Sequence, residues 1–394
     1  MLRRNGYKGA RTVTVNDWSN KTIGELCSFS NGYGFRPPDW SKEGLPIIRI
    51  QNLNGSKEFN YFKGIPDESW LVEPGTILFA WAGTRGVSFG PTIWSGPRGV
   101  LNQHIYRIHP YKGVNPLWLY AALEIATKNI EQSAHGFKAT LLHVRKEEIT
   151  SQVLHFPPPC EQQKIVTVLS NIDSLINSLD AFIAKKRDIK QATMQQLLTG
   201  KTRLPGFSGK WEIKKLGEIA YINMGQSPDS KNYNIKGIGI ALIQGNADIE
   251  NRKSISRVWT TQISKTCNAG DLIMTVRAPV GTIGIATKES CLGRGVCSLK
   301  PISDNKDFIF HSMVFLEDKW KLIGQGSTFD SANSSQIAEF PLLLTASVGE
   351  QQAIATILSD MDAEIAALEQ KRDKTRALKQ GIMQELLTGK TRLL

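Results

Sequence analysis

The sequence contains no long apolar run and few cysteines. No stretch of its 394 residues approaches the roughly 20 consecutive apolar residues that span a bilayer. The basic N-terminus leads into no apolar segment, so no signal peptide is expected. The five cysteines include no C-x-x-C pair, which disfavours a disulfide framework or a structural zinc site. These absences predict a cytoplasmic protein without a membrane partner.

No catalytic motif is complete. Gly-Lys-Thr at 200–202 and 389–391 resembles part of a phosphate-binding loop, but Gln195 and Gln384 stand where that loop requires glycine. Both tripeptides follow predicted helix ends, whereas phosphate binds at helix starts. The six histidines lack metal-ligand spacing. We therefore expect a binding protein with no catalytic residue, metal or cofactor of its own.

The formal net charge of +12 is unevenly distributed. Residues 1–160 carry 18 basic and 12 acidic side chains, and residues 161–204 carry 7 and 4. Residues 205–349 carry 16 and 13, whereas residues 350–394 carry 7 of each. A basic excess favours a polyanionic partner such as nucleic acid, although charge alone is equally compatible with a soluble basic protein.

A segment of 44 residues occurs twice, at 161–204 and at 350–393. At an offset of 189 residues and without a gap, 24 of the 44 pairs are identical. The segments before it repeat more weakly: Trp18 lies 193 residues before Trp211, and Arg98 lies 196 residues before Arg294. An internal repeat of this kind predicts two copies of one structural unit. We expect globular domains at 1–158 and 205–346 and long helices at 159–204 and 347–394.

Each copy of the 44-residue segment predicts a long helix with a narrow apolar seam. Apolar residues alternate at spacings of four and three, which is typical of a coiled coil. The helix-pairing residues are Ile165, Leu169, Ile172, Ile176 and Leu179 in the first copy and Ile354, Leu358, Met361, Ile365 and Leu368 in the second. A pseudo-twofold axis would pair the two copies antiparallel. A parallel pair, or packing of each helix on its own domain, is the alternative.

Two further stretches of the helices carry expectations. The seam turns polar at Lys186 and Lys190 in the first helix and at Arg372, Thr375 and Lys379 in the second, and we expect this part to face another protein or the DNA backbone. Residues 199–204 lie just past the predicted end of the first helix. They are the expected place for an insertion that lengthens the helix without disturbing the seam.

The globular segments predict an α+β fold built from two similar mixed α/β domains. Short β-type runs occur at 45–50, 76–80 and 104–108 in the first domain and at 240–243, 271–276 and 281–286 in the second. Amphipathic helices are predicted at 114–130 and 308–322.

Loops rich in Gly, Arg, Asn, Gln and aromatic residues separate these predicted strands. Arginine pairs bidentately with guanine, and Asn or Gln with adenine, in the major groove. Any single Gly or Asn can equally well shape a turn, but the set favours contact with DNA. The candidate DNA-binding residues are Tyr33, Arg36, Asn52, Arg85, Arg98, Gln103, Lys138, Gln226, Asn246, Arg277 and Arg294.

Two variable domains alternating with two nearly identical helices make the chain similar to the specificity (S) subunit of type I restriction-modification systems. The resemblance covers essentially the whole chain. Its most specific parts are Pro157-Pro158-Pro159-x-Glu161-Gln162-Gln163 with Leu197-Leu198-Thr199-Gly200, and Glu350-Gln351-Gln352 with Leu386-Leu387-Thr388-Gly389.

The resemblance implies that both globular parts are target recognition domains. Each would read one half of a bipartite, asymmetric site in double-stranded DNA, while the paired helices set the unread spacer. Two modification subunits, the methyltransferases, would dock on the helices, and restriction subunits would join them. S-adenosylmethionine, ATP and Mg would belong to these partners and not to this chain.

Two other classes of protein remain as alternatives. One is an enzyme with a duplicated core, such as a nicking or modifying protein, which the missing motifs disfavour. The other is a bivalent scaffold that binds protein, which the basic excess disfavours. Salt-dependent binding of DNA separates the scaffold from a DNA-binding protein.

Overall fold

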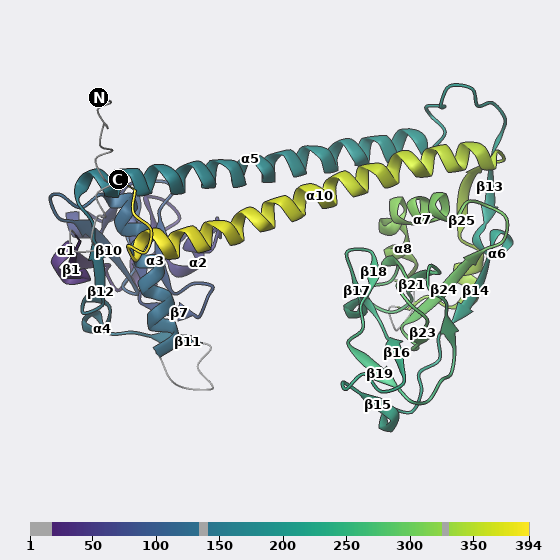
Figure 1. The fold of residues 1–394 in the computed structure, drawn as a ribbon, viewed down its shortest axis with the longest axis horizontal. Coiled ribbons are helices and arrows are strands. Elements are labelled where there is room, and N and C mark those ends of the chain that lie inside the picture. Colours follow the sequence, from purple (N-terminus) through teal and green to yellow (C-terminus); the bar gives the residue numbers. More distant parts are fainter. Residues whose placement is uncertain (1–17, 134–140, 325–330, 394) are drawn as a thin grey trace, which may run out of the picture. The chain divides into compact units, whose positions relative to one another are not determined.

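The computed structural model describes residues 18–133, 141–324 and 331–393 (Figure 1). The chain forms two compact units. Unit 1 runs to Ser178 and resumes at Arg372, and unit 2 is Leu179–Lys371. The helices α5 (Pro159–Leu197) and α10 (Val348–Leu387) each belong partly to both units. The expected four-part division follows the secondary structure, whereas the compact units divide both helices.

The globular part of unit 1 is built from short strands and a few helices. Its strands are β1 (Ser19–Thr22), β2 (Cys27–Asn31), β3 (Leu45–Ile48), β4 (Tyr61–Phe62), β5 (Leu71–Val72), β6 (Ile77–Ala80), β7 (Ala82–Thr84), β8 (Gly90–Ile93), β9 (Gly99–Leu101), β10 (Ile105–Pro110), β11 (Leu141–His143) and β12 (Val153–Phe156). Its α-helices are α1 (Ile23–Leu26), α2 (Ile50–Leu53), α3 (Pro116–Ser133) and α4 (Lys146–Thr150), with 3-10 helices at Pro37–Asp39 and Glu68–Trp70.

The globular part of unit 2 has the same character. Its strands are β13 (Trp211–Lys215), β14 (Ala220–Met224), β15 (Tyr233–Asn234), β16 (Ile240–Ile243), β17 (Ile249–Glu250), β18 (Lys253–Ser254), β19 (Val258–Thr260), β20 (Thr266–Cys267), β21 (Leu272–Thr275), β22 (Ile283–Ile285), β23 (Ser290–Leu292), β24 (Val296–Pro301) and β25 (Pro341–Thr345). Its α-helices are α6 (Leu216–Ile219), α7 (Lys306–Phe315), α8 (Glu317–Gly324) and α9 (Ser334–Ala338), with 3-10 helices at Ser230–Asn232 and Asn246–Asp248.

The sheets of the two units have matching strand orders. The order β2-β10-β6-β8 in unit 1 corresponds to β14-β24-β21-β22 in unit 2, where β18 and β17 extend the sheet. A second sheet, β4-β3-β9-β5, corresponds to β19-β16-β23-β20, and the pair β1-β12 corresponds to β13-β25. The internal repeat and the α+β class predicted from the sequence are therefore confirmed. The helix expected at 308–322 is divided into α7 and α8.

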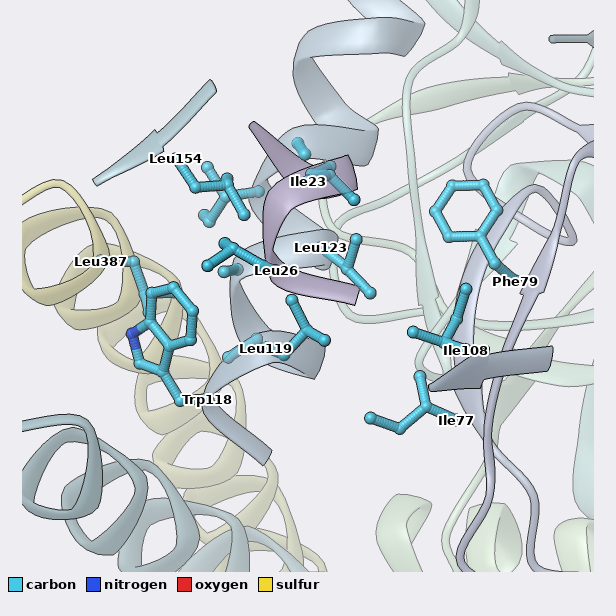
Figure 2. Packing of buried hydrophobic residues seen from close by; sticks show 14 of the residues in the cluster. Ile23, Leu26, Ile77, Phe79, Ile108, Trp118, Leu119, Leu123, Leu154 and Leu387 are labelled. Atoms are coloured by element: carbon cyan, nitrogen blue, oxygen red, sulfur yellow. The ribbon is translucent and has the colours of Figure 1, made fainter. Parts of the chain in front are cut away.

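Both faces of the central sheet in unit 1 are covered. Successive residues of a strand point to opposite faces, and all four residues of β6 are buried. Ile77 and Phe79 belong to the cluster that includes α3, whereas Leu78 belongs to a second cluster with residues of β3, β5 and β9. Figure 2 shows Leu119 and Leu123 of α3 between Leu26 and the strand residues. The sheet is thus enclosed between α3 and the second sheet.

The long helices run antiparallel within each unit. In unit 1, Asp173 of α5 pairs with Lys379 of α10 at 2.6 Å. In unit 2, Lys190 of α5 pairs with Asp362 of α10. The two pairs are related by the 189-residue repeat. The antiparallel arrangement predicted from the sequence is confirmed, and charged pairs continue it where the apolar seam ends.

The polar part of the seam has a different role from the one expected. Lys186 binds Glu364 at 2.7 Å, and Lys190 and Lys379 bind aspartates of the facing helix. Their ammonium groups are directed to the other helix, because each meets a carboxylate there. The expectation that these lysines face DNA or another protein is corrected.

The seam residues are also part of the domain cores. Ile165 and Leu169 share a buried cluster with α3 and with Leu386 and Leu387 of α10. Ile354 and Leu358 share one with β21, β24 and α7. Pairing with the other helix and packing on a domain, treated above as alternatives, therefore occur together.

The first glutamate of each helix is bound by an arginine that follows the other helix. Arg392 donates two hydrogen bonds of 2.8 Å to Glu161, and Arg203 donates bonds of 2.6 and 2.8 Å to Glu350. Bidentate pairing of this kind fixes both distance and orientation. Glu350 is fully buried, and its carboxylate also accepts a 2.6 Å hydrogen bond from the Thr345 hydroxyl. The Glu350 amide donates to the Ser347 hydroxyl, which caps α10.

The two glutamines that follow each glutamate tie the helix to its domain. Gln162 accepts a 2.7 Å bond from the Asn115 amide, and Gln351 accepts one of 2.7 Å from the Asn305 amide. The asparagine side chains in turn cap α3 and α7. The repeated Glu-Gln-Gln therefore connects the start of each long helix to a helix of its domain and to the end of the other long helix. The same contacts in both units account for its presence in both copies.

Candidate nucleic-acid interface

Three loops of unit 1 begin at one edge of the central sheet. Tyr106 pairs with Asn31, and Ile105 pairs with Ala80, so the end of β2, the end of β6 and the start of β10 coincide. Main-chain bonds hold the loops together: the Tyr33 amide donates to the Leu101 carbonyl at 2.8 Å. We call this edge, with residues 32–34, 81–84 and 102–104, the reading edge of unit 1.

Aromatic side chains gather at the reading edge of unit 1. Trp81 lies in ring contact with His104 and His143, with centroids 5.1 and 5.4 Å apart, and its indole N–H donates to the Gln103 carbonyl at 3.1 Å. Burial, and to a smaller extent the charge of His143, lowers the pKa of His104 below its usual 6.5. Tyr33 stacks on Trp70 and is 42% exposed.

Unit 2 has the same edge. Cys297 pairs with Met224, and Val296 pairs with Thr275, so β14, β21 and β24 meet there as β2, β6 and β10 do. The Gln226 amide donates to the Leu292 carbonyl at 2.9 Å, as Tyr33 does to Leu101. Residues 225–227, 276–280 and 293–295 form the reading edge of unit 2.

The structure brings five of the candidate residues to the two reading edges. Tyr33 and Gln103 lie on the edge of unit 1, and Gln226, Arg277 and Arg294 lie on that of unit 2. All five are exposed. Each edge thus presents side chains with different hydrogen-bonding capacity on the same backbone.

Three other candidates are exposed on loops that flank the edges. Arg36 follows Tyr33 on the same loop. Arg85 follows β7, whose first residue Ala82 adjoins Trp81. Asn246 lies near the edge of unit 2 because the Gly293 amide donates to the Ile243 carbonyl at 2.7 Å.

Asn52 is a structural residue. It is 6% exposed. Its side-chain oxygen accepts from the Arg49 amide at 2.9 Å, and its side-chain nitrogen donates to the carbonyls of Ser56 and Glu58. The amide therefore holds its own loop and is not available for a base, which corrects the expectation from the sequence.

Arg98 lies at the far end of β9 from the reading edge. It precedes Gly99 and pairs with Glu73 at 3.0 Å, whereas Asn102 and Gln103 follow β9 at the edge. The sequence repeat aligned Arg98 with Arg294, but the strand register shows that these two residues are not equivalent. Lys138, the remaining candidate, lies outside the described residues.

Sequence reasoning missed the ring cluster of Trp81, His104 and His143. Trp81 stands in a Gly- and Arg-containing loop, which is a weak signal for a binding residue. The histidines are 39 residues apart and carry no motif. Only the pairing of β11 with β7 brings His143 to Trp81.

Comparisons with known proteins agree with this architecture. The family model described as the type I restriction modification DNA specificity domain matches twice, over residues 15–187 and 208–376. The chain belongs to this family. Its two matches correspond to the two structural repeats.

Individual relatives match most of the chain. A putative type I restriction enzyme MjaX specificity subunit from Methanocaldococcus jannaschii is 26% identical, over 96% of this chain and 94% of the relative. The EcoBI specificity subunit of Escherichia coli is 22% identical, over 73% of this chain and 67% of the relative.

Solved structures share the fold. A chain from a type I R-M system studied for its assembly and conformational transition superimposes with a TM-score of 0.62 at 20% identity, over 95% of this chain and 99% of the other. The S subunit from M. genitalium gives 0.59 at 15% identity, over 97% and 98%.

Residues 18–133, 141–324 and 331–393 contain neither a metal-binding cluster nor a membrane-spanning helix. No group of three or more His, Cys, Asp or Glu side chains there could hold a metal ion. No helix there is both long and apolar enough to cross a membrane.

Proposed function

We propose that the chain recognises a bipartite, asymmetric site in double-stranded DNA, with one half-site read at each reading edge. The paired helices set the length of the unread spacer between the half-sites. Two modification subunits dock on the chain and methylate the recognised site, and restriction subunits join this complex. The chain acts in the cytoplasm, and S-adenosylmethionine, ATP and Mg are bound by its partners.

One observation supports this proposal above all. The strand register of the two central sheets is the same, yet the exposed side chains at the edges differ: Tyr33 and Gln103 in unit 1, Gln226 and Arg294 in unit 2. Loops on a rigid scaffold commonly carry binding residues. Two scaffolds of matching strand order with unlike side chains are suited to reading two unlike half-sites, because base edges are distinguished by their donors and acceptors.

The proposal is tested by exchanging one domain. Residues 205–346 are replaced with the equivalent part of a related specificity subunit, and the methylated motifs are read by sequencing the DNA of cells that carry the complete system. The exchange should alter one half of the motif and leave the other half and the spacer unchanged. The reciprocal exchange of residues 18–158 is the control, and it should alter only the other half.

A change in both halves after a single exchange would contradict the proposal that each domain recognises one half-site. The protein-binding scaffold predicts a different result, namely no binding of DNA by the purified complex. A DNA-binding subunit instead predicts affinity that falls steeply as salt rises, because the basic side chains release counterions from the phosphates.

A further inference from the structure

The strand register assigns Gln103 and Arg294 to the same position of the two repeats. Ile105 is paired with Ala80 in unit 1, and Val296 is paired with Thr275 in unit 2. Each of these residues begins its strand, β10 or β24. Gln103 and Arg294 both lie two residues before that start. The loop before β9, where Arg98 lies, has no part in this equivalence.

The backbone around Gln103 is closely held. The Trp81 indole donates to its carbonyl at 3.1 Å, and the Trp81 amide donates to the His104 carbonyl at 3.3 Å. A Cβ atom added at Gly34 would lie 2.3 Å from the Gln103 side-chain oxygen, so Gly34 leaves room for that amide. The amide nitrogen lies 3.2 Å from His104 Nε2. The side chain is nevertheless exposed.

Arg294 is held in the corresponding way. Its amide donates to the Ser227 hydroxyl at 3.0 Å, and Ser227 stands one residue after Gln226, as Gly34 stands after Tyr33. Gly295 lies against Gln244: an added Cβ there would come within 2.0 Å of the Gln244 carbonyl oxygen. The main chain is fixed while the side chain is exposed.

Each of these two side chains can make a pair of hydrogen bonds to one base, and the two side chains favour different bases. A glutamine amide pairs bidentately with adenine, as donor to N7 and acceptor from N6, and an arginine guanidinium pairs bidentately with O6 and N7 of guanine. We propose that Gln103 and Arg294 occupy one equivalent base-reading position in the two domains, where Gln103 selects adenine in the first half-site and Arg294 selects guanine in the second. This inference rests on the proposed function, since it names the bases read at the reading edges.

The test exchanges the two side chains. Gln103→Arg and Arg294→Gln are made separately in the full chain and expressed with its modification partners, and the methylated motifs are read by sequencing. Gln103→Arg should convert one adenine of the first half-site to guanine. Arg294→Gln should convert one guanine of the second half-site to adenine. Affinity of each purified complex for the original site should fall roughly 5- to 100-fold and recover on the converted site.

Arg98→Gln is the matched control, because it removes the same charge from an exposed arginine at the other end of β9. It should leave the motif unchanged. If a variant no longer methylates, competition between duplexes that differ only at the adenine or guanine reads the preference of its purified complex directly.

The outcomes separate this inference from the proposed function. An unchanged base preference in both exchanges, or a change in the opposite half-site, overturns the assignment while DNA recognition by the chain stands. Absence of any motif that depends on the wild-type gene, together with no salt-sensitive DNA binding, overturns the proposed function itself.

Discussion

At the level of single residues, the two arginines that follow the long helices perform the same task. Arg203 and Arg392 each bind the first glutamate of the other helix, and each also lies near a tryptophan ring, Trp211 or Trp18, at 5.9 and 5.1 Å. A glycine with positive φ at 200 or 389 turns the chain toward this contact. In each unit the contact therefore joins the end of one helix to the start of the other.

The contact at Glu161 should make unit 1 sensitive to acid. Burial alone raises the pKa of this carboxyl, but hydrogen bonds from Arg392, Trp18 and the Leu393 amide together lower it below the usual 4.5. A lowered pKa in the folded state adds stability above pH 4.5 that is lost as the pH falls through the folded pKa. Thermal unfolding followed from pH 7 to pH 3 should show this loss in the wild type.

Glu161→Gln should be less stable than the wild type at pH 7 and show a weaker dependence on acid, because the titrating group is gone. Glu43→Gln is the control, since Glu43 is 77% exposed and contacts only Lys63 among the pairs of the described residues. An exposed pair contributes about 0–1 kcal/mol. Identical pH profiles for wild type and Glu161→Gln would show that this carboxylate has no role in acid stability.

Asn52 and Asn246 are both loop asparagines, yet they should respond differently to substitution. Asn52→Ala removes the acceptor for the Arg49 amide and the donor to the Ser56 and Glu58 carbonyls, contacts that are partly buried. The free energy of unfolding in urea should fall by about 1–3 kcal/mol. Asn246→Ala changes an exposed side chain and should stay within about 0.5 kcal/mol. Equal losses would contradict the structural role of Asn52.

At the level of elements, α10 has one face in a core and another in solvent. Leu358 is 0% exposed and packs in the cluster of unit 2, whereas Leu378 is 59% exposed. Leu358→Ala should lower the free energy of unfolding by about 2–5 kcal/mol, because it leaves a cavity. Leu378→Ala, the same change on the same helix, should alter it by less than about 0.5 kcal/mol. Denaturant titration of both variants decides the matter, and a cost below 1 kcal/mol for Leu358→Ala would mean that the cluster tolerates the cavity.

The structure indicates a different insertion site for lengthening the helix from the one predicted from the sequence. Leu197 and Leu198 are buried in the core of unit 2, and Arg203 binds Glu350. An insertion at residues 199–204, the place expected from the sequence, would displace that arginine. The boundary between the units offers a better place, because every contact described above lies within one unit.

At the level of the whole molecule, we expect matched insertions at that boundary to widen the spacer. Seven helical residues are added between Ser178 and Leu179 in α5 and seven between Lys371 and Arg372 in α10. One heptad in each helix keeps the 4-3 seam in register and adds about 10 Å at roughly 1.5 Å per residue. That length corresponds to about three base pairs at roughly 3.4 Å each. Motif sequencing should recover both half-sites with a spacer about three base pairs longer.

Insertion into α5 alone is the control, since it mismatches the two helices and should reduce methylation. A double insertion that methylates with an unchanged spacer would show that the partner subunits, and not the helices, determine the distance between the half-sites.

The sequence by itself determined the repeat, the class of fold and the pairing of the helices. These features follow from local periodicity: a 4-3 apolar pattern specifies a helix face wherever that helix lies, and a gapless 44-residue repeat specifies two copies of it. The resemblance to specificity subunits rested on the same segments. For the loops, the sequence shows only which residue types are present. It therefore gave no reason to separate Asn52, which is buried, from Gln103, which is exposed.

Only the tertiary structure decided which of those loop residues face outward and which correspond between the repeats. Loops of different length precede β9 and β23, so sequence offsets drift, and Arg98 matched Arg294 by an accident of a shared Arg-Gly-Val. Strand register is set by hydrogen bonds between segments distant in the sequence, and it makes Arg294 the equivalent of Gln103 instead. Long-range contacts likewise join Arg392 to Glu161, 231 residues away, because a bidentate ion pair depends on where the two segments lie in space and not on their separation along the sequence.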